Sequence, residues 1–139
     1  MAPPPRPVYF TDENVLGLGR LLRRIGREDV LYPGHERLAA VALGAPDLEW
    51  MPIIADLGLV VLTRDRRIRT RPAELNSYLE LGIRSVWMGA KQDLGPHDQL
   101  EMFLKHEVRL QHEIVKRGAG PWALAMSPSG IRPVNLKRR

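Results

Sequence analysis

Short apolar runs alternate along the chain with longer segments in which apolar residues recur every three or four positions. The short runs are rich in β-branched and aromatic residues, and they predict strands at 8–11, 29–32, 59–63 and 83–88. The longer segments predict helices at 15–25, 47–57, 72–81 and 95–117. A glycine follows each of these helices, as is common where a helix ends. Strands that alternate with helices favour a mainly parallel sheet enclosed by helices.

The first and last predicted helices each have one apolar face. The residues of these faces are Val15, Leu18, Leu21, Leu22 and Ile25 in the first helix, and Leu100, Phe103, Leu104, Val108, Ile114 and Val115 in the last. Gly17 and Gly19 weaken the first helix by about 1 kcal/mol each relative to alanine, so its stability must come from packing. Pro52 lies inside the second helix, which therefore begins at Asp47 with a distorted first turn or begins near Glu49.

The remaining segments add a C-terminal hairpin to a three-layer α/β/α architecture. Residues 33–46 have no regular period and predict a loop with at most one helical turn. Residues 122–126 and 131–136 flank a turn sequence and predict an antiparallel hairpin, with Pro133 placing its second strand at an edge of the sheet. We expect residues 1–139 to form a single domain in which 1–7 and 137–139 are flexible.

The composition is that of a globular protein. Hydrophobic residues make up 44% and charged residues 27% of the 139 positions, and both fractions are ordinary. The chain has no cysteine, which excludes disulfides and thiolate-bound metals. Its proline-rich start does not resemble a signal peptide, and no apolar run reaches the ~18 residues that a membrane span needs. These features predict a cytoplasmic protein without a membrane partner.

The charge of the chain is positive and unevenly distributed. A net charge of +5 favours a polyanionic partner such as nucleic acid. The densest group of cations follows the third predicted strand and consists of Arg64, Arg66, Arg67, Arg69 and Arg71. An aspartate, Asp65, lies within this group. A carboxylate that can bind a metal cation therefore lies among arginines that can bind an anion. A site that hydrolyses a phosphodiester requires both.

Three aspartates converge on the carboxyl edge of the predicted sheet. Asp12 follows the first strand, Asp65 follows the third, and Asp47 begins a helix antiparallel to the strands. Ligand sites of parallel sheets lie at this edge. Like charges held close together are costly unless a cation neutralises them, and oxygen ligands without His or Cys favour Mg²⁺ or Mn²⁺. The pattern predicts a metal site that aligns a water with a phosphate.

Each acidic residue taken alone has a simpler explanation. Asp47 and Asp65 could be helix caps, and Glu13 and Glu49 could be first-turn residues favoured by the helix dipole. Glu13 and Glu49 are also additional candidate ligands, and the choice between Asp47 and Glu49 stays open. Convergence of three aspartates on one edge favours the metal site over capping.

The segments Thr11–Asn14, Pro46–Asp47 and Val60–Asp65 together resemble the successive acidic motifs of PIN-like nuclease domains. The closest likeness is to the compact bacterial subgroup that includes VapC-type toxins of toxin–antitoxin pairs, and it spans residues 8–90. The resemblance implies a metal-dependent endoribonuclease that binds Mg²⁺ or Mn²⁺. Its catalytic metal ligands would be Asp12, Asp47 and Asp65.

The same resemblance implies how RNA would be bound. We expect Thr63, Arg64, Arg66, Arg67 and Arg69 to form the substrate-binding rim, with Thr63 orienting a ligand or the strand end. An antitoxin protein and a second copy of the chain, in a homodimer, are the expected protein partners.

Two other functions are compatible with this pattern. A receiver-like module also gathers acids at the carboxyl edge, but it needs a lysine on a late strand, and only Lys91 directly follows the fourth predicted strand. That reading also leaves the arginine group unexplained. A non-catalytic module with a degenerate site would bind RNA without cleaving it.

Overall fold

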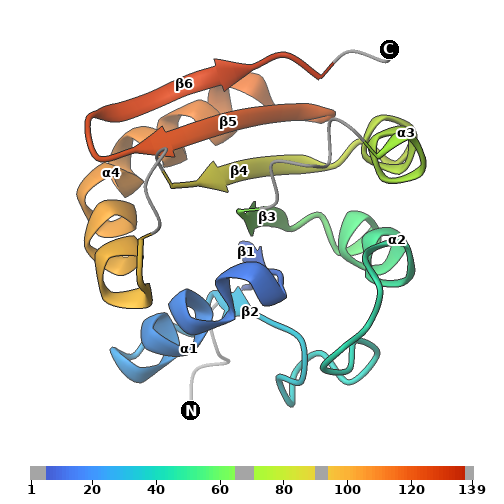
Figure 1. Ribbon diagram of the computed structural model, residues 1–139, viewed down its shortest axis with the longest axis horizontal. Helices are drawn as coiled ribbons and strands as arrows, with labels where there is room; N and C mark the ends of the chain where they lie inside the picture. The colour runs from blue at the N-terminus through green and yellow to red at the C-terminus, as the bar shows by residue number, and fades with distance from the viewer. Residues whose placement is uncertain (1–5, 65–70, 90–93, 137–139) are drawn as a thin grey trace.

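The computed structural model describes residues 6–64, 71–89 and 94–136. Six strands form one sheet in the order β2-β1-β3-β4-β5-β6 (Figure 1). These strands are β1 (Tyr9–Thr11), β2 (Val30–Leu31), β3 (Val60–Thr63), β4 (Arg84–Met88), β5 (Trp122–Ser127) and β6 (Gly130–Val134). Neighbouring strands pair in parallel, except that β5 and β6 form an antiparallel hairpin with β6 at the edge.

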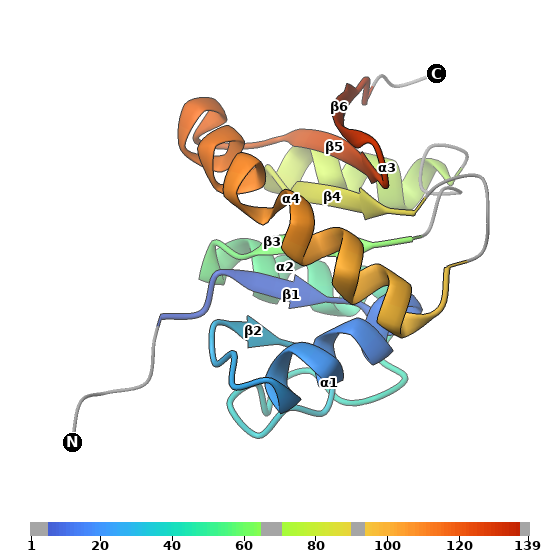
Figure 2. The same ribbon diagram turned by 90° about the vertical axis from the view of Figure 1, so that its left-hand side faces the viewer.

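Helices cover both faces of this sheet. They are the 3₁₀ turn η1 (Glu13–Val15) and the α-helices α1 (Leu16–Arg24), α2 (Asp47–Leu57), α3 (Pro72–Leu81) and α4 (Pro96–Arg117). Figure 2 shows α1 and α4 in front of the sheet and α2 and α3 behind it. The predicted three-layer α/β/α fold with a mainly parallel sheet and a C-terminal hairpin is confirmed. Within the described residues, no helix is both long and apolar enough to cross a membrane.

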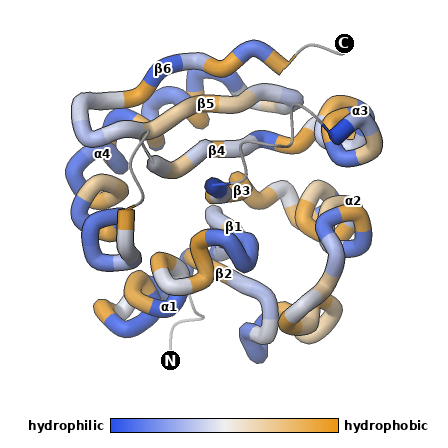
Figure 3. The backbone as a smooth tube through the Cα atoms, in the orientation of Figure 1, coloured by the Kyte–Doolittle hydropathy of each residue, from blue (hydrophilic) through white to orange (hydrophobic). Residues whose placement is uncertain are grey.

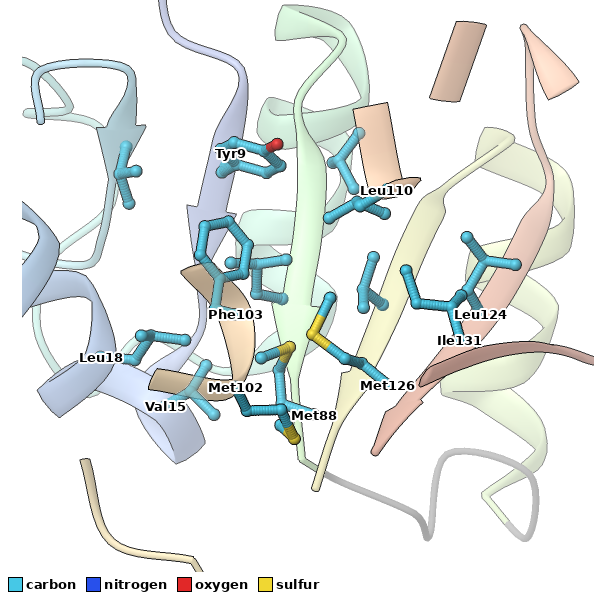
Figure 4. Packing of buried hydrophobic residues seen from close by; sticks show 14 of the residues in the cluster. Tyr9, Val15, Leu18, Met88, Met102, Phe103, Leu110, Leu124, Met126 and Ile131 are labelled. Atoms are coloured by element: carbon cyan, nitrogen blue, oxygen red, sulfur yellow. The ribbon is translucent and has the colours of Figure 1, made fainter. Parts of the chain in front are cut away.

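The core consists of two apolar clusters, one on each face of the sheet. All four residues of β3 are buried, because this central strand is covered on both faces. Val60 and Leu62 belong to the cluster beneath α1 and α4, and Val61 belongs to the cluster beneath α2 and α3. In the first cluster the rings of Tyr9 and Phe103 meet edge to face with centroids 5.2 Å apart (Figure 4).

Two glycines allow α1 to approach its neighbours closely. A Cβ atom at Gly19 would lie 2.4 Å from the hydroxyl oxygen of Thr11 in β1, and one at Gly17 would lie 2.7 Å from the ring of Pro96 in α4. These distances are too short for a side chain, so the glycines are required by packing. This agrees with the prediction that packing stabilises a helix with two weak helix formers.

We therefore expect Gly19→Ala to lower the free energy of unfolding by about 1–3 kcal/mol, although alanine is the better helix former. The added methyl group would collide with the side chain of Thr11, which is fully buried. Urea unfolding measures the change. Arg20→Ala, an exposed position of the same helix, is the control and should change stability by no more than about 0.5 kcal/mol. A Gly19→Ala protein as stable as the wild type would contradict this account of the packing.

An ionic network joins α1, the start of β2 and α4. The guanidinium group of Arg27 donates two hydrogen bonds to Asp29, at 2.9 and 2.8 Å, and two to Glu107 of α4, at 2.9 and 2.5 Å. These side chains are partly buried, and bidentate pairs of this kind have defined geometry. Burial, together with the nearby charge of Glu107, raises the pKa of the Tyr9 hydroxyl. The network fixes the position of α4 relative to the end of α1.

The structure corrects four predicted core positions. Ile25, Leu104, Val108 and Val115 were expected on buried faces, but each is exposed. The buried residues of α4 are instead Gln99, Met102, Phe103 and Leu110. Polar and apolar segments alternate along α1 and α4 in Figure 3. In α4, apolar residues lie on two opposite sides of the helix. The spacing of its apolar residues therefore does not show which side packs against the sheet.

The second predicted helix begins at Asp47, and not near Glu49, and it continues past Pro52 to Leu57. Pro52 is exposed, so its ring lies on the outer side of the helix. Residues 33–46 form the loop between β2 and α2, as predicted, and this loop contains turns but no helical turn.

Candidate active site

Asp12 lies directly after β1, at the carboxyl edge of the sheet. Its backbone N–H donates to the carbonyl of Leu62 at 3.2 Å, so Asp12 continues the pairing of β1 with β3. The side chain is only 2% exposed. One carboxylate oxygen, Oδ1, accepts from the backbone N–H of Asn14 at 3.0 Å, and Oδ2 accepts from the hydroxyl of Thr63 at 2.5 Å. Both oxygens are thus held by neutral donors, one of which comes from a residue 51 positions away in the sequence.

Asp47 is the first residue of α2, which runs antiparallel to the strands and so begins at the same edge (Figure 2). The N-cap position is occupied by Pro46, so the explanation of Asp47 as an N-cap is wrong. The Oδ1 atom of Asp47 accepts from the indole N–H of Trp50 at 3.1 Å. Trp50 is 2% exposed, and the centroid of its ring lies 4.9 Å from the centroid of the Phe10 ring. A buried tryptophan in the core therefore orients this carboxylate.

The two carboxylates influence one another electrostatically. The pKa of Asp12 is raised to about 7, chiefly by burial and in smaller part by the charge of Asp47, while the hydrogen bonds from Thr63 and Asn14 act in the opposite direction. Among the described residues, Asp12 forms no ion pair with a lysine or arginine. A buried carboxylate beside a second one is charged only at a cost, and a divalent cation removes that cost. This donor set fits a hard cation that prefers oxygen ligands.

The two glutamates have different environments. The carboxylate of Glu13 accepts from the backbone N–H of Gly44, so Glu13 attaches η1 to the loop that leads into α2. Glu49 is exposed on the first turn of α2. Asp47 is the α2 carboxylate whose charge is among the main influences on Asp12. Glu13 therefore stabilises the loop beside the site, and the geometry favours Asp47 over Glu49 as a neighbour of Asp12.

Thr63 is the last residue of β3, and Arg64 follows it at the same edge of the sheet. Thr63 is fully buried, and its hydroxyl is directed at Asp12. Arg64 is half-buried, and its Nη1 atom donates to the carbonyl of Leu94 at 3.4 Å, close to the start of α4. The hydroxyl of Thr63 thus supports a carboxylate, which is a different role from direct contact with substrate.

Part of the predicted site lies outside the described residues, namely Asp65, Arg66, Arg67 and Arg69. Among the residues that the structure does describe, no three His, Asp or Glu side chains gather in a metal-binding group. Asp12 and Asp47 are two members of the predicted set, and the third, Asp65, is two residues beyond Thr63 in the chain.

Two supporting residues were not found from the sequence. The role of Trp50 in orienting Asp47 was missed, although their spacing of three positions brings side chains together on a helix. The N–H of Asn14 was also missed, although an aspartate two positions before it is a common capping arrangement.

A family model described as a PIN like domain matches residues 7–90, more than half of the chain. The chain belongs to the PIN-like domain family. The match covers Asp12, Asp47 and Thr63 and agrees closely with the resemblance over residues 8–90, whereas α4 and the β5–β6 hairpin follow it. No curated protein and no solved structure matches the chain.

Membership of the PIN-like family has general consequences for function. PIN-like domains are commonly nucleases, they generally bind nucleic acids, and they generally use divalent metal ions. In this PIN-like chain the buried Asp12 and the neighbouring Asp47 lie at the edge of the sheet where parallel α/β proteins bind ligands.

Proposed function

We propose that this PIN-like protein is a metal-dependent endoribonuclease that hydrolyses phosphodiester bonds of RNA. The observation that carries the proposal is the state of Asp12, whose buried carboxylate is held by two neutral donors beside a second carboxylate at the carboxyl edge. Such an arrangement is costly for folding alone and is suited to a bound cation.

Asp12, Asp47 and Asp65 are the proposed ligands of Mg²⁺ or Mn²⁺. When bound, the cation supplies charge that stabilises the phosphate in the transition state and makes water a better nucleophile. The chain contributes orientation, because Thr63 and Asn14 hold Asp12 and Trp50 holds Asp47. Asp47 is the ligand we assign to α2, and Glu13 and Glu49 have no direct part in the site.

The proposed RNA-binding rim consists of Arg64, Arg66, Arg67 and Arg69. These residues follow β3 in the sequence, and the first of them, Arg64, lies at the edge where Asp12 and Asp47 are found. Contacts between arginines and phosphates weaken as salt rises, so RNA binding should fall steeply with ionic strength.

The biological role we propose is that of the toxin in a toxin–antitoxin pair, acting on RNA in the cytoplasm. The support is the resemblance of the acidic motifs to the compact subgroup and the basic character of the chain. A gene for a small DNA-binding protein directly beside the gene of this chain, together with binding of the two purified products, would test it.

Incubation of the purified protein with a 5′-labelled single-stranded RNA tests the nuclease proposal. We expect internal cleavage that requires Mg²⁺ or Mn²⁺ and stops when EDTA is added. Salt-sensitive RNA binding without cleavage in either metal would support a non-catalytic RNA-binding module instead. A phosphoaspartate detected by mass spectrometry after exposure to acetyl phosphate would support a receiver-like module.

Thr63→Val tests the role of the hydroxyl that holds Asp12. The valine is nearly the same size, so it removes a hydrogen bond from Asp12 without leaving a cavity. We expect the Mg²⁺ concentration for half-maximal cleavage to rise about 10–100-fold, the usual effect of losing a partner of a metal ligand. Thr63→Ser keeps the hydroxyl and should stay close to the wild type. An unchanged metal requirement in Thr63→Val would show that the bond does not orient a ligand.

A further inference from the structure

A pocket of about 230 Å³ lies between the N-terminal half of α4 and the turn that joins β5 to β6. It is lined by three apolar residues, Leu94, Met102 and Pro128, and by three charged ones, Asp98, Glu101 and Lys105. An apolar wall with a few charged groups is the usual composition of a ligand pocket. Pockets for drug-sized ligands have volumes of about 300–1,000 Å³, so this pocket suits a smaller group.

The pocket lies at the same edge of the sheet as the candidate active site. Pro128 directly follows β5, and Figure 2 shows α4 beginning at the edge to which the arrows of β3 and β4 point. Asp12 follows β1, and the order of the sheet places β3 and β4 between β1 and β5. Spacings of ~4.8 Å between neighbouring strands therefore put the end of β5 about 14 Å from Asp12 along this edge. A few nucleotides of single-stranded RNA span such a distance.

The backbone carbonyl of Leu94 connects the pocket with the end of β3. It accepts from the Nη1 atom of Arg64 at 3.4 Å and from the Nε2 atom of Gln99 at 3.0 Å. Gln99 is 3% exposed, so its bond fixes Leu94 against the start of α4. Arg64 directly follows Thr63, whose hydroxyl holds Asp12. One wall of the pocket is therefore attached to the strand end that supports the candidate metal ligand.

The charges of the pocket favour a nucleobase over a phosphate. Asp98 and Glu101 are exposed acids, and Lys105 is the single cation among the lining residues, so negative charge is in excess. A phosphate group would be repelled there. A base is neutral, and its flat faces can lie against the apolar wall, where the thioether of Met102 is a favourable neighbour for an aromatic ring.

The hydrogen-bonding groups of the pocket match guanine best. Glu101 and Lys105 are four positions apart, so their side chains are neighbours on α4. A carboxylate only accepts hydrogen bonds, and an ammonium group only donates them. Guanine is the one base with two adjacent donors, N1–H and N2–H, that can occupy both oxygens of a carboxylate, and its acceptor O6 lies beside them. Adenine and cytosine offer a single amino group, and uracil offers a single N–H between two acceptors.

We propose that this base pocket binds a guanine of the RNA close to the cleaved bond. Glu101 accepts from N1–H and N2–H, and Lys105 donates to O6. The ammonium group of Lys105 is placed for this role because it donates to the carbonyl of Pro128 at 3.5 Å, at the rim of the pocket. The inference rests on the proposed ribonuclease function and specifies its substrate as single-stranded RNA with a guanine at a fixed distance from the cleaved bond.

Binding of RNA in EDTA, where the proposed cleavage does not occur, tests the base pocket by NMR. One probe is a short RNA of uridines, and the other is the same RNA with one central guanosine. We expect the guanosine RNA to bind about 10-fold more tightly and to shift the amide signals of Leu94, Glu101 and Met102, which the uridine RNA leaves in place. Glu101→Gln replaces one acceptor with a donor and should remove most of this difference in affinity. Glu80→Gln, exposed near the end of α3 at the opposite edge of the sheet, is the matched control and should keep it.

Cleavage of a randomised single-stranded RNA in Mn²⁺ gives a second measurement. We expect guanine to be enriched at one fixed position relative to the cleaved bond, and inosine there, which lacks the N2 amino group, to lower the rate. Equal binding of the two probes, or a guanine preference that Glu101→Gln leaves unchanged, overturns the base pocket. Cleavage without any preference also overturns it and leaves the nuclease proposal standing. Guanine-dependent binding at the pocket without cleavage in Mg²⁺ or Mn²⁺ overturns the nuclease proposal and supports the pocket as an RNA-binding site.

Discussion

Asp12→Asn is expected to lower metal-dependent RNA cleavage by about 10³-fold or more while the protein remains folded. Asparagine fills the same space, and it keeps an oxygen that accepts a hydrogen bond, but it is a poor ligand for a hard cation. The fold should survive because the buried carboxylate is itself unfavourable when charged, as its raised pKa shows. Single-turnover cleavage of a labelled RNA measures the rate, and circular dichroism verifies the fold.

Matched variants on α2 make this test specific. Asp47→Asn should lose most of the activity, whereas Glu49→Gln and Asp56→Asn should retain it, because Glu49 is exposed and Asp56 lies near the other end of the helix. This comparison also decides between Asp47 and Glu49 as the ligand on α2. Cleavage by Asp12→Asn at the wild-type rate would remove the aspartates from the reaction.

In the absence of metal, we expect the contribution of Asp12 to the free energy of unfolding to fall as the pH rises from about 4 to about 7. The pKa of Asp12 is about 7 in the folded protein and 3.8 in the unfolded chain, so the folded state holds the proton more tightly. The contribution of Asp12 to the free energy of unfolding is therefore fully present below about pH 4, and it is lost as this carboxyl group ionises. The full difference amounts to about 4 kcal/mol for a shift of this size.

Metal ions should reverse this loss. At pH 8 Mn²⁺ neutralises the charged carboxylates and should raise the free energy of unfolding, whereas at pH 5 protons compete for the same oxygens and the increase should be smaller. Urea unfolding at both pH values, with EDTA or with Mn²⁺, measures this. The difference in the free energy of unfolding between the wild type and Asp12→Asn, compared at the two pH values, separates the effect of Asp12 from that of other titrating groups. One such group is His35, whose pKa is lowered by burial. Equal pH dependence in both proteins would contradict the assignment.

Much of the fold could be predicted from local patterns. The apolar run that forms β3 is buried on both sides, and the helices that end at Gly58 and Gly82 do so because these glycines adopt the left-handed conformation. The hairpin was predictable because turn residues separate two strand-like segments and because Pro133 suits only an edge strand.

The orientation of α4 could not be predicted in the same way. Two opposite sides of this helix carry apolar residues, and the sheet could have covered either one. The buried side includes Gln99, a polar residue whose amide donates to the carbonyl of Leu94 at 3.0 Å. A burial of this kind depends on a tertiary hydrogen bond, which a hydropathy pattern does not contain.

In the candidate site, the two aspartates and an orienting role for Thr63 were predictable, whereas the particular hydrogen bonds that hold the carboxylates were not. Asp12 and Asp47 were found because strand ends and helix starts meet at one edge of a parallel sheet. The hydrogen bond from Thr63 to Asp12 joins residues far apart in the sequence, so only the pairing of β1 with β3 reveals it. The bond from Trp50 to Asp47 likewise depends on how a core tryptophan packs against Phe10.

The central claim is that the carboxyl edge of this sheet binds a divalent metal through Asp12 and Asp47. Paramagnetic broadening of amide NMR signals by Mn²⁺ tests it most directly, because the effect falls steeply with distance and needs no enzymatic activity. We predict that substoichiometric Mn²⁺ first broadens the amides of Asp12, Asn14 and Asp47, and that Asp12→Asn loses this effect. Broadening centred elsewhere in the molecule, or broadening that persists unchanged in Asp12→Asn, would contradict the account.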